Sequence, residues 1–161
     1  MRALLQDPVG SVPWLTDALG TFGDRLGTVL FRVPSPVTVD LERLSALLAT
    51  WPPGLPLTFE FQDASWHVDE VYERLAESGV ALCATDLPED PDPPTLRLTG
   101  PFLYLRLRRD DYSATEIESW AQRLVPFLAN GRDAFAFFRH DATGRATELA
   151  AALRQAVDRS A

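Results

Sequence analysis

The sequence predicts an α/β fold in which helices pack on a parallel sheet, and two patterns lead to this prediction. Five short apolar runs recur along the chain, and most of them are followed by a segment with helical periodicity. Strands that alternate with helices are typical of a parallel sheet. The predicted strands are Thr28–Val33, Leu57–Gln62, Val80–Thr85, Phe102–Leu107 and Ala134–Arg139.

Two helices are predicted around the first strand. Ser11 as a cap and Pro13 in the first turn indicate a short helix over Trp14–Phe22, before that strand. After the strand, Asp40 is the expected N-cap of a helix whose leucines recur on one face. The Trp51–Gly54 segment, with its two prolines and a glycine, ends this helix.

Three more helices are predicted after later strands. The second strand leads to a helix over Asp69–Ser78, with Gly79 at the position just beyond its end. Ser113 and Glu116 have the spacing of a capping box, which predicts the start of the helix after the fourth strand. The last helix is expected over about Thr143–Val157, where apolar residues recur at helical spacing.

A proline-rich stretch, Asp86–Pro94, separates the third and fourth strands, and no helix can propagate through it. Because it joins two strands of one sheet, we interpret it as a long loop rather than a domain boundary. The chain has 161 residues, a length typical of one domain. We therefore expect residues 1–161 to form a single domain.

Composition narrows the classes of function. The formal net charge of −8 disfavours nucleic-acid binding, which depends on surplus basic residues. The chain contains no lysine, which excludes a Schiff-base lysine or a lysine general base among its own residues. No segment approaches the ~20 apolar residues of a membrane span, and the single cysteine, Cys83, forms no intramolecular disulfide. We expect a cytoplasmic protein that does not bind membranes.

Polar residues gather late in the predicted strands, and they are the candidate site. In a parallel α/β barrel, the carboxyl ends of the strands meet at one mouth, where binding and catalysis take place. Glu60 and Asp86 are the carboxylates placed to act as acid or base. Arginines near the mouth suit an anionic small molecule such as a phosphate or carboxylate. The candidate ligand-binding residues are Arg32, Gln62, Trp66, Tyr104, Arg106, Arg108 and His140.

Structural roles compete with these functional ones. Glu60 and Arg106 can neutralise one another inside a barrel without any reaction, and we favour that interpretation for the pair. Trp66 is equally explained as a stacking platform at the mouth or as a hydrophobic plug that fixes its loop. No histidine or cysteine spacing fits a metal site, and there is no glycine-rich phosphate loop, so we expect neither a metal nor a cofactor.

Four motifs lie in order along the chain: Leu26–Pro34, Glu60–Trp66, Tyr104–Leu107 and Phe137–Asp141. Together they resemble the YecE-like family, domain of unknown function 72. The resemblance implies a (β/α) TIM-type barrel in which the five strands correspond to strands four to eight. We expect the family's first three strands to have no counterpart in this chain. The family's biochemical activity is not established, so the resemblance implies a fold and a mouth rather than a reaction.

Departures from the family pattern leave three functions open. The family usually has Gln where Arg32 stands and a pair of Asn residues where Arg139 and His140 stand. One function is an enzyme that acts on an anionic small molecule, and a second is a non-catalytic remnant that binds a ligand or oligomerises. A third, phosphodiester or nucleic-acid processing, rests on fold analogy alone.

A five-stranded sheet built for a closed barrel would have two unpaired edges and an exposed apolar wall. We therefore expect the chain to form a homo-oligomer or to pair with a separately encoded N-terminal fragment.

Overall fold

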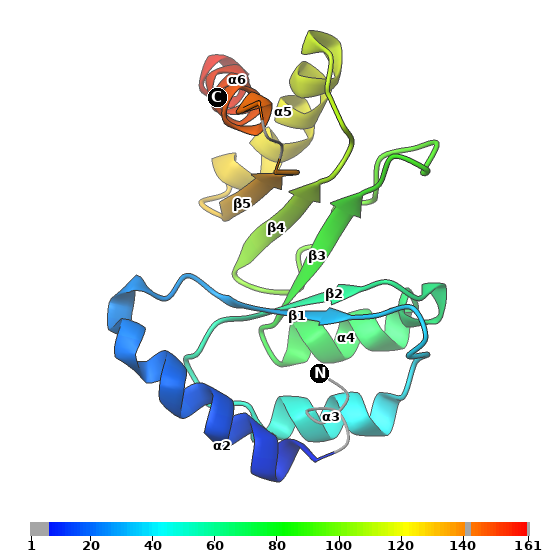
Figure 1. Ribbon diagram of the computed structural model, residues 1–161, viewed down its shortest axis with the longest axis vertical. Helices are drawn as coiled ribbons and strands as arrows, with labels where there is room; N and C mark the ends of the chain where they lie inside the picture. The colour runs from blue at the N-terminus through cyan, green and yellow to red at the C-terminus, as the bar shows by residue number, and fades with distance from the viewer. Residues whose placement is uncertain (1–6, 141–142, 161) are drawn as a thin grey trace. The chain divides into compact units, whose positions relative to one another are not determined.

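The computed structural model describes residues 7–140 and 143–160, and its sheet is parallel throughout (Figure 1). The five strands pair in sequence order, so each strand lies beside the next one along the chain. The α/β prediction is confirmed, and no predicted strand end is displaced by more than one residue. Asp141, the last residue of the fourth family motif, lies outside the described residues. The strands are β1 Val29–Val33, β2 Leu57–Phe61, β3 Ala81–Asp86, β4 Phe102–Leu107 and β5 Asp133–Phe138.

The chain divides into two compact units, residues 1–82 (unit 1) and residues 83–161 (unit 2), and each is described by itself. The division falls inside β3. The first two residues of this strand, Ala81 and Leu82, pair with β2, and its residues 83–86 pair with β4. Each unit has its own apolar core.

In unit 1, the helices α3 (Leu41–Thr50) and α4 (Asp69–Glu77) cover the same face of β1 and β2 (Figure 1). Alternation along the strands turns Phe31, Phe59 and Phe61 toward this face, where they are buried. The rings of Phe59 and Phe61 are stacked with centroids 5.2 Å apart, and Trp66 continues the stack at 4.5 Å from Phe61. The helical elements of unit 1 are α2 Pro8–Leu19, η1 Gly20–Arg25, α3 Leu41–Thr50, η2 Ala64–Trp66 and α4 Asp69–Glu77.

The start of the first helix differs from the sequence prediction. Ser11 is not its cap: the helix begins at Pro8, and the Asp7 carboxylate accepts a hydrogen bond of 3.2 Å from the backbone N–H of Gly10. Pro8 has the fixed φ that suits a first turn, so it takes the role expected of Pro13. Pro13 lies inside the helix with its ring exposed.

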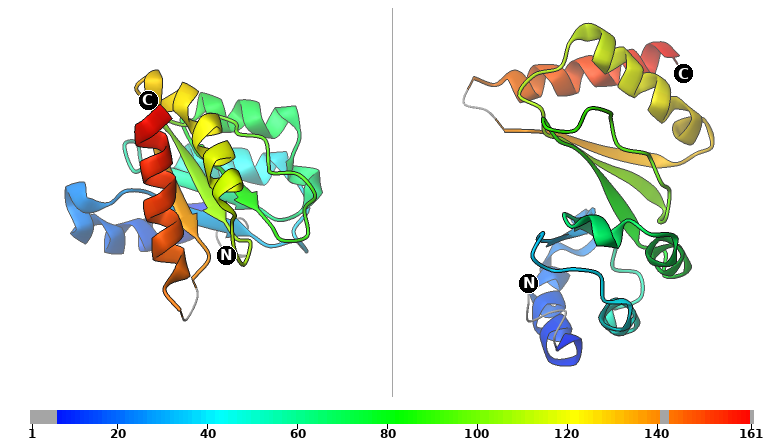
Figure 2. Two further views of the ribbon diagram at one scale, coloured as in Figure 1. Left: turned by 90° about the horizontal axis from the view of Figure 1, so that it is seen from above. Right: turned by 90° about the vertical axis from the view of Figure 1, so that its right-hand side faces the viewer.

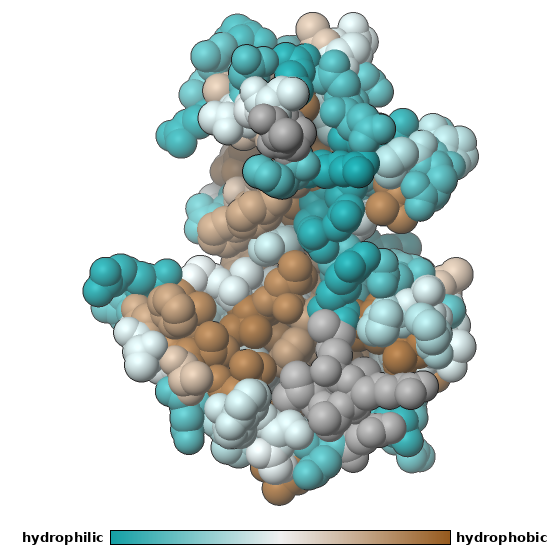
Figure 3. All heavy atoms as spheres, viewed as in Figure 1, coloured by the Kyte–Doolittle hydropathy of each residue, from teal (hydrophilic) through white to brown (hydrophobic). Residues whose placement is uncertain are grey.

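Large apolar side chains remain exposed on α2 and η1. Trp14 is 80% exposed, Val9 73% and Phe22 54%. Figure 3 shows apolar side chains gathered over this part of unit 1. Exposed apolar area of this kind is typical of a surface that contacts a partner.

The other caps of unit 1 agree with the prediction. The Asp40 carboxylate accepts the backbone N–H of Arg43 at 3.0 Å, and α3 starts at the next residue, Leu41. Gly79 has a φ of +63°, which a residue with a side chain rarely adopts, and it lies just beyond the C-cap of α4.

In unit 2, α5 (Ala114–Ala129) and α6 (Arg145–Ser160) lie side by side on one face of β4 and β5 (Figure 2). Alternate residues of β4, including Leu103, Leu105 and Leu107, are buried against these helices. The last helix begins and ends a few residues later than predicted, since its periodic residues mark its buried face rather than its ends.

The predicted capping box of α5 is confirmed. The Ser113 hydroxyl accepts the Glu116 backbone N–H at 3.3 Å, and the Glu116 carboxylate accepts the Ser113 backbone N–H at 2.8 Å. Two N–H groups at the start of the helix thereby find acceptors, which fixes where α5 begins.

Candidate functional site

Arg32 and Glu60 lie opposite each other on neighbouring strands of unit 1. They are register partners on β1 and β2, and Arg32 Nε lies 3.6 Å from Glu60 Oε2. The Glu60 side chain is 3% exposed, whereas that of Arg32 is 46% exposed. A buried carboxylate requires a compensating charge. Arg32 supplies one, so the predicted acid/base residue takes part in an ion pair.

Gln62 and Trp66, also predicted to bind ligand, lie in different surroundings in unit 1. Gln62 is exposed just after β2. Trp66 is 0% exposed and donates a 2.7 Å hydrogen bond from Nε1 to the carbonyl of Val37. This bond and the stack on Phe61 fix the segment after β1 to the core. Of the two interpretations of Trp66, the geometry favours the hydrophobic plug.

A turn next to Trp66 is stabilised by a carboxylate. The Asp63 side chain accepts the Ser65 backbone N–H at 3.0 Å and caps the short helix η2. Hydrogen bonds from Ser65 hold the pKa of Asp63 below its ordinary value.

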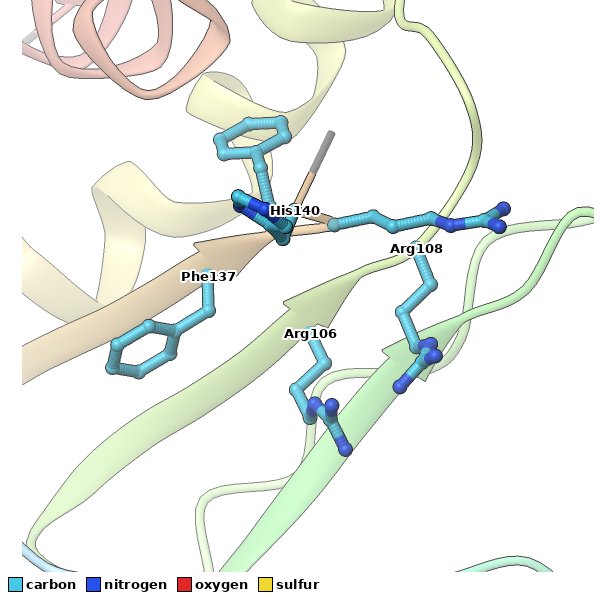
Figure 4. A pocket seen from close by; sticks show the side chains of 6 residues that line it. Arg106, Arg108, Phe137 and His140 are labelled. Carbon is cyan, nitrogen blue, oxygen red and sulfur yellow. The ribbon is translucent and has the colours of Figure 1, made fainter. Parts of the chain in front are cut away.

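Unit 2 contains a hollow of about 380 Å³ at the carboxyl ends of β4 and β5 (Figure 4). Three guanidinium groups, an imidazole and two phenyl rings line it. Figure 4 shows Arg106 on β4 and Arg108 just beyond its end extending to the same side, with His140 beyond the end of β5. The structure thus brings three of the predicted ligand-binding residues together. The lining residues are Arg106, Arg108, Phe137, Phe138, Arg139 and His140.

The arginines of the hollow differ in how they are engaged. Arg139 forms an ion pair with the exposed Asp110. The backbone N–H of Arg108 donates to the carbonyl of Asp86 at 2.9 Å, which fixes the place where this side chain leaves the backbone. Among the described residues, the guanidinium of Arg108 has no ion-pair or hydrogen-bond partner. A guanidinium in that state can bind a phosphate or carboxylate through two parallel hydrogen bonds.

Tyr104, another predicted ligand-binding residue, lies beside the hollow rather than in its lining. It is 9% exposed, and its ring centroid is 5.1 Å from that of Phe137. Tyr104 therefore supports a lining residue.

Asp86 lies on the helix-covered face of unit 2 and does not line the hollow. Its register partner is Leu107, which is buried under α5 and α6. Both carboxylate oxygens accept from Arg109 Nε, at 3.0 and 3.1 Å, and the Tyr112 hydroxyl donates to Oδ2 at 2.8 Å. The second predicted acid/base residue is thus the centre of a buried hydrogen-bonded network.

The same network joins two loops. Arg109 also donates from Nη2 to the carbonyl of Asp90 at 2.9 Å, which ties the segment after β4 to the loop after β3. The hydrogen bonds to Asp86 raise the pKa of Arg109. Burial, followed by the hydrogen bond to Asp86, raises the pKa of Tyr112 above its ordinary value of 10.0. Sequence reasoning missed Arg109 and Tyr112, although a polar run with one aromatic directly after the fourth strand was a visible signal.

Arg123 on α5 anchors the far end of the loop between β3 and β4. It donates from Nη2 to the carbonyl of Pro94, and its guanidinium lies 4.2 Å from the centre of the Trp120 ring. Burial lowers the pKa of Arg123. The proline-rich loop is therefore held at two points, by Arg109 and by Arg123.

Within residues 7–140 and 143–160, no group of three or more His, Cys, Asp or Glu side chains is arranged to hold a metal ion. Over the same ranges, no helix has the length and apolar character needed to cross a membrane.

Comparison with known proteins identifies similar chains. Residues 3–161 match the family model described as "Protein of unknown function DUF72". A DUF72 family protein from Thermotoga maritima is 22% identical with a TM-score of 0.79, and the match covers 98% of this chain and 68% of that one. One from Enterococcus faecalis is 16% identical with a TM-score of 0.72, covering 93% of this chain and 66% of that one.

At these identities the two structures show a shared fold, and this chain spans about two thirds of their length. None of the curated proteins matches the chain.

Proposed function

We propose that this chain, which belongs to the DUF72 family, binds an anionic small molecule in the hollow at the carboxyl ends of β4 and β5. The observation that carries the proposal is the lining, where Arg106, Arg108, Arg139 and His140 are concentrated in about 380 Å³. The whole chain has a net charge of −8, so the local excess of positive charge from the three arginines runs against its overall composition. Such an excess attracts anions and provides donors for them.

The position of the hollow supports the same function. Ligands of parallel α/β proteins bind at the carboxyl ends of the strands, where loops present polar side chains. Arg108 is the strongest candidate contact, because its backbone is anchored to Asp86 while its guanidinium has no partner among the described residues. Arg32, Gln62 and Trp66 belong to unit 1 and have no role in this proposal.

Binding is favoured over catalysis. Glu60 is paired with Arg32, and both oxygens of Asp86 are engaged by Arg109 and Tyr112. A general base needs an accessible lone pair within reach of the proton that it removes. The two predicted acid/base residues are thus committed to interactions inside the protein.

We also propose that the five strands form part of a TIM-type barrel. Each strand pairs in parallel with the next one in sequence, and within each unit the helices cover one face, as in that fold. β1 and β5 are the edges of the five-strand order, and further strands would pair there. A second copy of the chain or a separately encoded fragment is the proposed source. Analytical ultracentrifugation that finds only monomer at all concentrations would contradict association between copies.

The binding proposal is tested by titrating the full chain with inorganic phosphate in a calorimeter. Changing Arg108→Ser removes a charge-assisted contact, so we expect the dissociation constant to rise by about tenfold or more. The matched control is Arg154→Ser, an exposed arginine on α6 outside the hollow. Binding should also weaken as salt is added, since exposed charges are screened. Equal phosphate affinity in the wild type and the Arg108 variant would refute the proposal.

A further inference from the structure

An exposed aromatic ring lies among the cations of the hollow. Phe137 on β5 is 50% exposed, although most of the aromatic side chains in unit 2 are buried or half-buried. It is the register partner of Arg106, so the two side chains leave neighbouring strands on the same face, about 4.8 Å apart. Figure 4 shows Phe137 and Arg106 on the same side of the strands.

The ring of Phe137 packs against the ring of Tyr104. Its centroid lies 5.1 Å from the ring of Tyr104 at an interplanar angle of 31°. Phe138, the other phenyl group of the lining, packs against Tyr112 in the core of unit 2. Phe137 is therefore the aromatic surface that the hollow offers to a ligand.

The spacing of these groups limits the shape of the ligand. Arg106 and Arg108 are two residues apart on one face, or about 6.6 Å along an extended strand. Arg106 is also the register partner of Phe137. An anion bound between the guanidinium groups of Arg106 and Arg108 is therefore placed near the ring of Phe137. A ligand that uses all three side chains carries its anionic group only a few bonds from a flat apolar ring.

We propose that the ligand of the hollow is an aromatic ring bearing one phosphate or carboxylate, with the ring on Phe137 and the anion between Arg106 and Arg108. This inference rests on the proposed function and adds the class of ligand. A lone inorganic anion leaves the exposed ring of Phe137 in water, whereas an aromatic anion covers it. Burial of apolar area and ring stacking then favour the aromatic ligand.

The test compares three probes on the full chain: inorganic phosphate, methyl phosphate and phenyl phosphate. Ring stacking predicts that phenyl phosphate binds about tenfold more tightly than methyl phosphate. In Phe137→Ser this preference should disappear, while the affinity for inorganic phosphate stays within about twofold of the wild type. The retained phosphate affinity also shows that the variant is folded. Trp14→Ser, which removes an exposed aromatic of unit 1, is the control and should keep the preference.

Three outcomes overturn the inference in distinguishable ways. If all three probes bind with similar affinity and Arg108→Ser weakens all of them, anion binding stands but the aromatic ligand is refuted. If no probe binds, both the proposed function and this inference fail. A Phe137→Ser variant that changes the association state but keeps the preference for phenyl phosphate also contradicts it, because the ring would then serve a protein contact.

Discussion

Changing Asp86→Asn replaces the acceptor at the centre of the buried network in unit 2 by a group of the same size. The carboxylate is 1% exposed, its two oxygens share the single N–H of Arg109 Nε, and it also accepts from the Tyr112 hydroxyl. Asparagine keeps one acceptor oxygen but turns an uncharged NH₂ donor toward the N–H of Arg109 Nε, so Arg109 loses its charge partner even where that oxygen still accepts from Tyr112. Removing one member of a fully buried ion pair costs about 3–5 kcal/mol.

The expected loss here is somewhat smaller. The Arg109 side chain is 24% exposed and regains part of its hydration when its partner is neutral. We therefore expect the free energy of unfolding to fall by about 2–4 kcal/mol. In urea this moves the unfolding midpoint down by about 1–2 M.

The assay is urea denaturation followed by far-ultraviolet circular dichroism. Asp111→Asn is the matched control, because Asp111 forms an ion pair with Arg145 at 2.9 Å but its side chain is 64% exposed. Exposed ion pairs contribute little, so the control should unfold near the wild-type midpoint. If Asp86→Asn also unfolds there, the network does not stabilise the protein.

Two further predictions concern Tyr112 and Ser113. Because the native pKa of Tyr112 is raised, the unfolded chain loses this proton near pH 10.0 while the folded chain keeps it. Stability from this group is complete below that pH and falls as pH rises further, so the midpoint should drop as pH rises from about 10 to about 11, and Tyr112→Phe should reduce the drop. Ser113→Ala removes half of the capping box and should lower the free energy of unfolding by about 1 kcal/mol in denaturant titrations. The hydrogen bonds from Ser113 hold the pKa of Glu116 below its ordinary 4.5. The effect of Ser113→Ala should therefore shrink as pH falls below that value, and an effect independent of pH would argue against the reciprocal box.

Local patterns predicted most of the secondary structure. Strand positions follow from short apolar runs. The helix ends at Asp40, Gly79 and Ser113 are set by a hydrogen bond or a backbone dihedral angle that involves residues only a few positions apart. Where two local signals competed, the prediction was wrong: both Pro8 and Pro13 can start a helix, and Asp7 supports the earlier one. The family resemblance, carried by short ordered motifs, is confirmed by the family match.

Side-chain partners across the fold required the tertiary structure. Asp86 is 23 residues from Arg109 and 26 from Tyr112, and no local pattern selects these partners from the many polar residues available. Glu60 and Arg32 meet because parallel pairing sets their strands in register. The hollow arises in the same way, because β4 and β5 end together and place Arg106 beside Phe137.

The polar ends of the strands, visible in the sequence alone, indicated where a site would lie. Which of these residues are free to bind depends on distance and burial, and these exist only once the chain is packed. Packing commits Glu60, Asp86 and Trp66 to the protein itself. It leaves the guanidinium of Arg108 and the ring of Phe137 in the lining of the hollow.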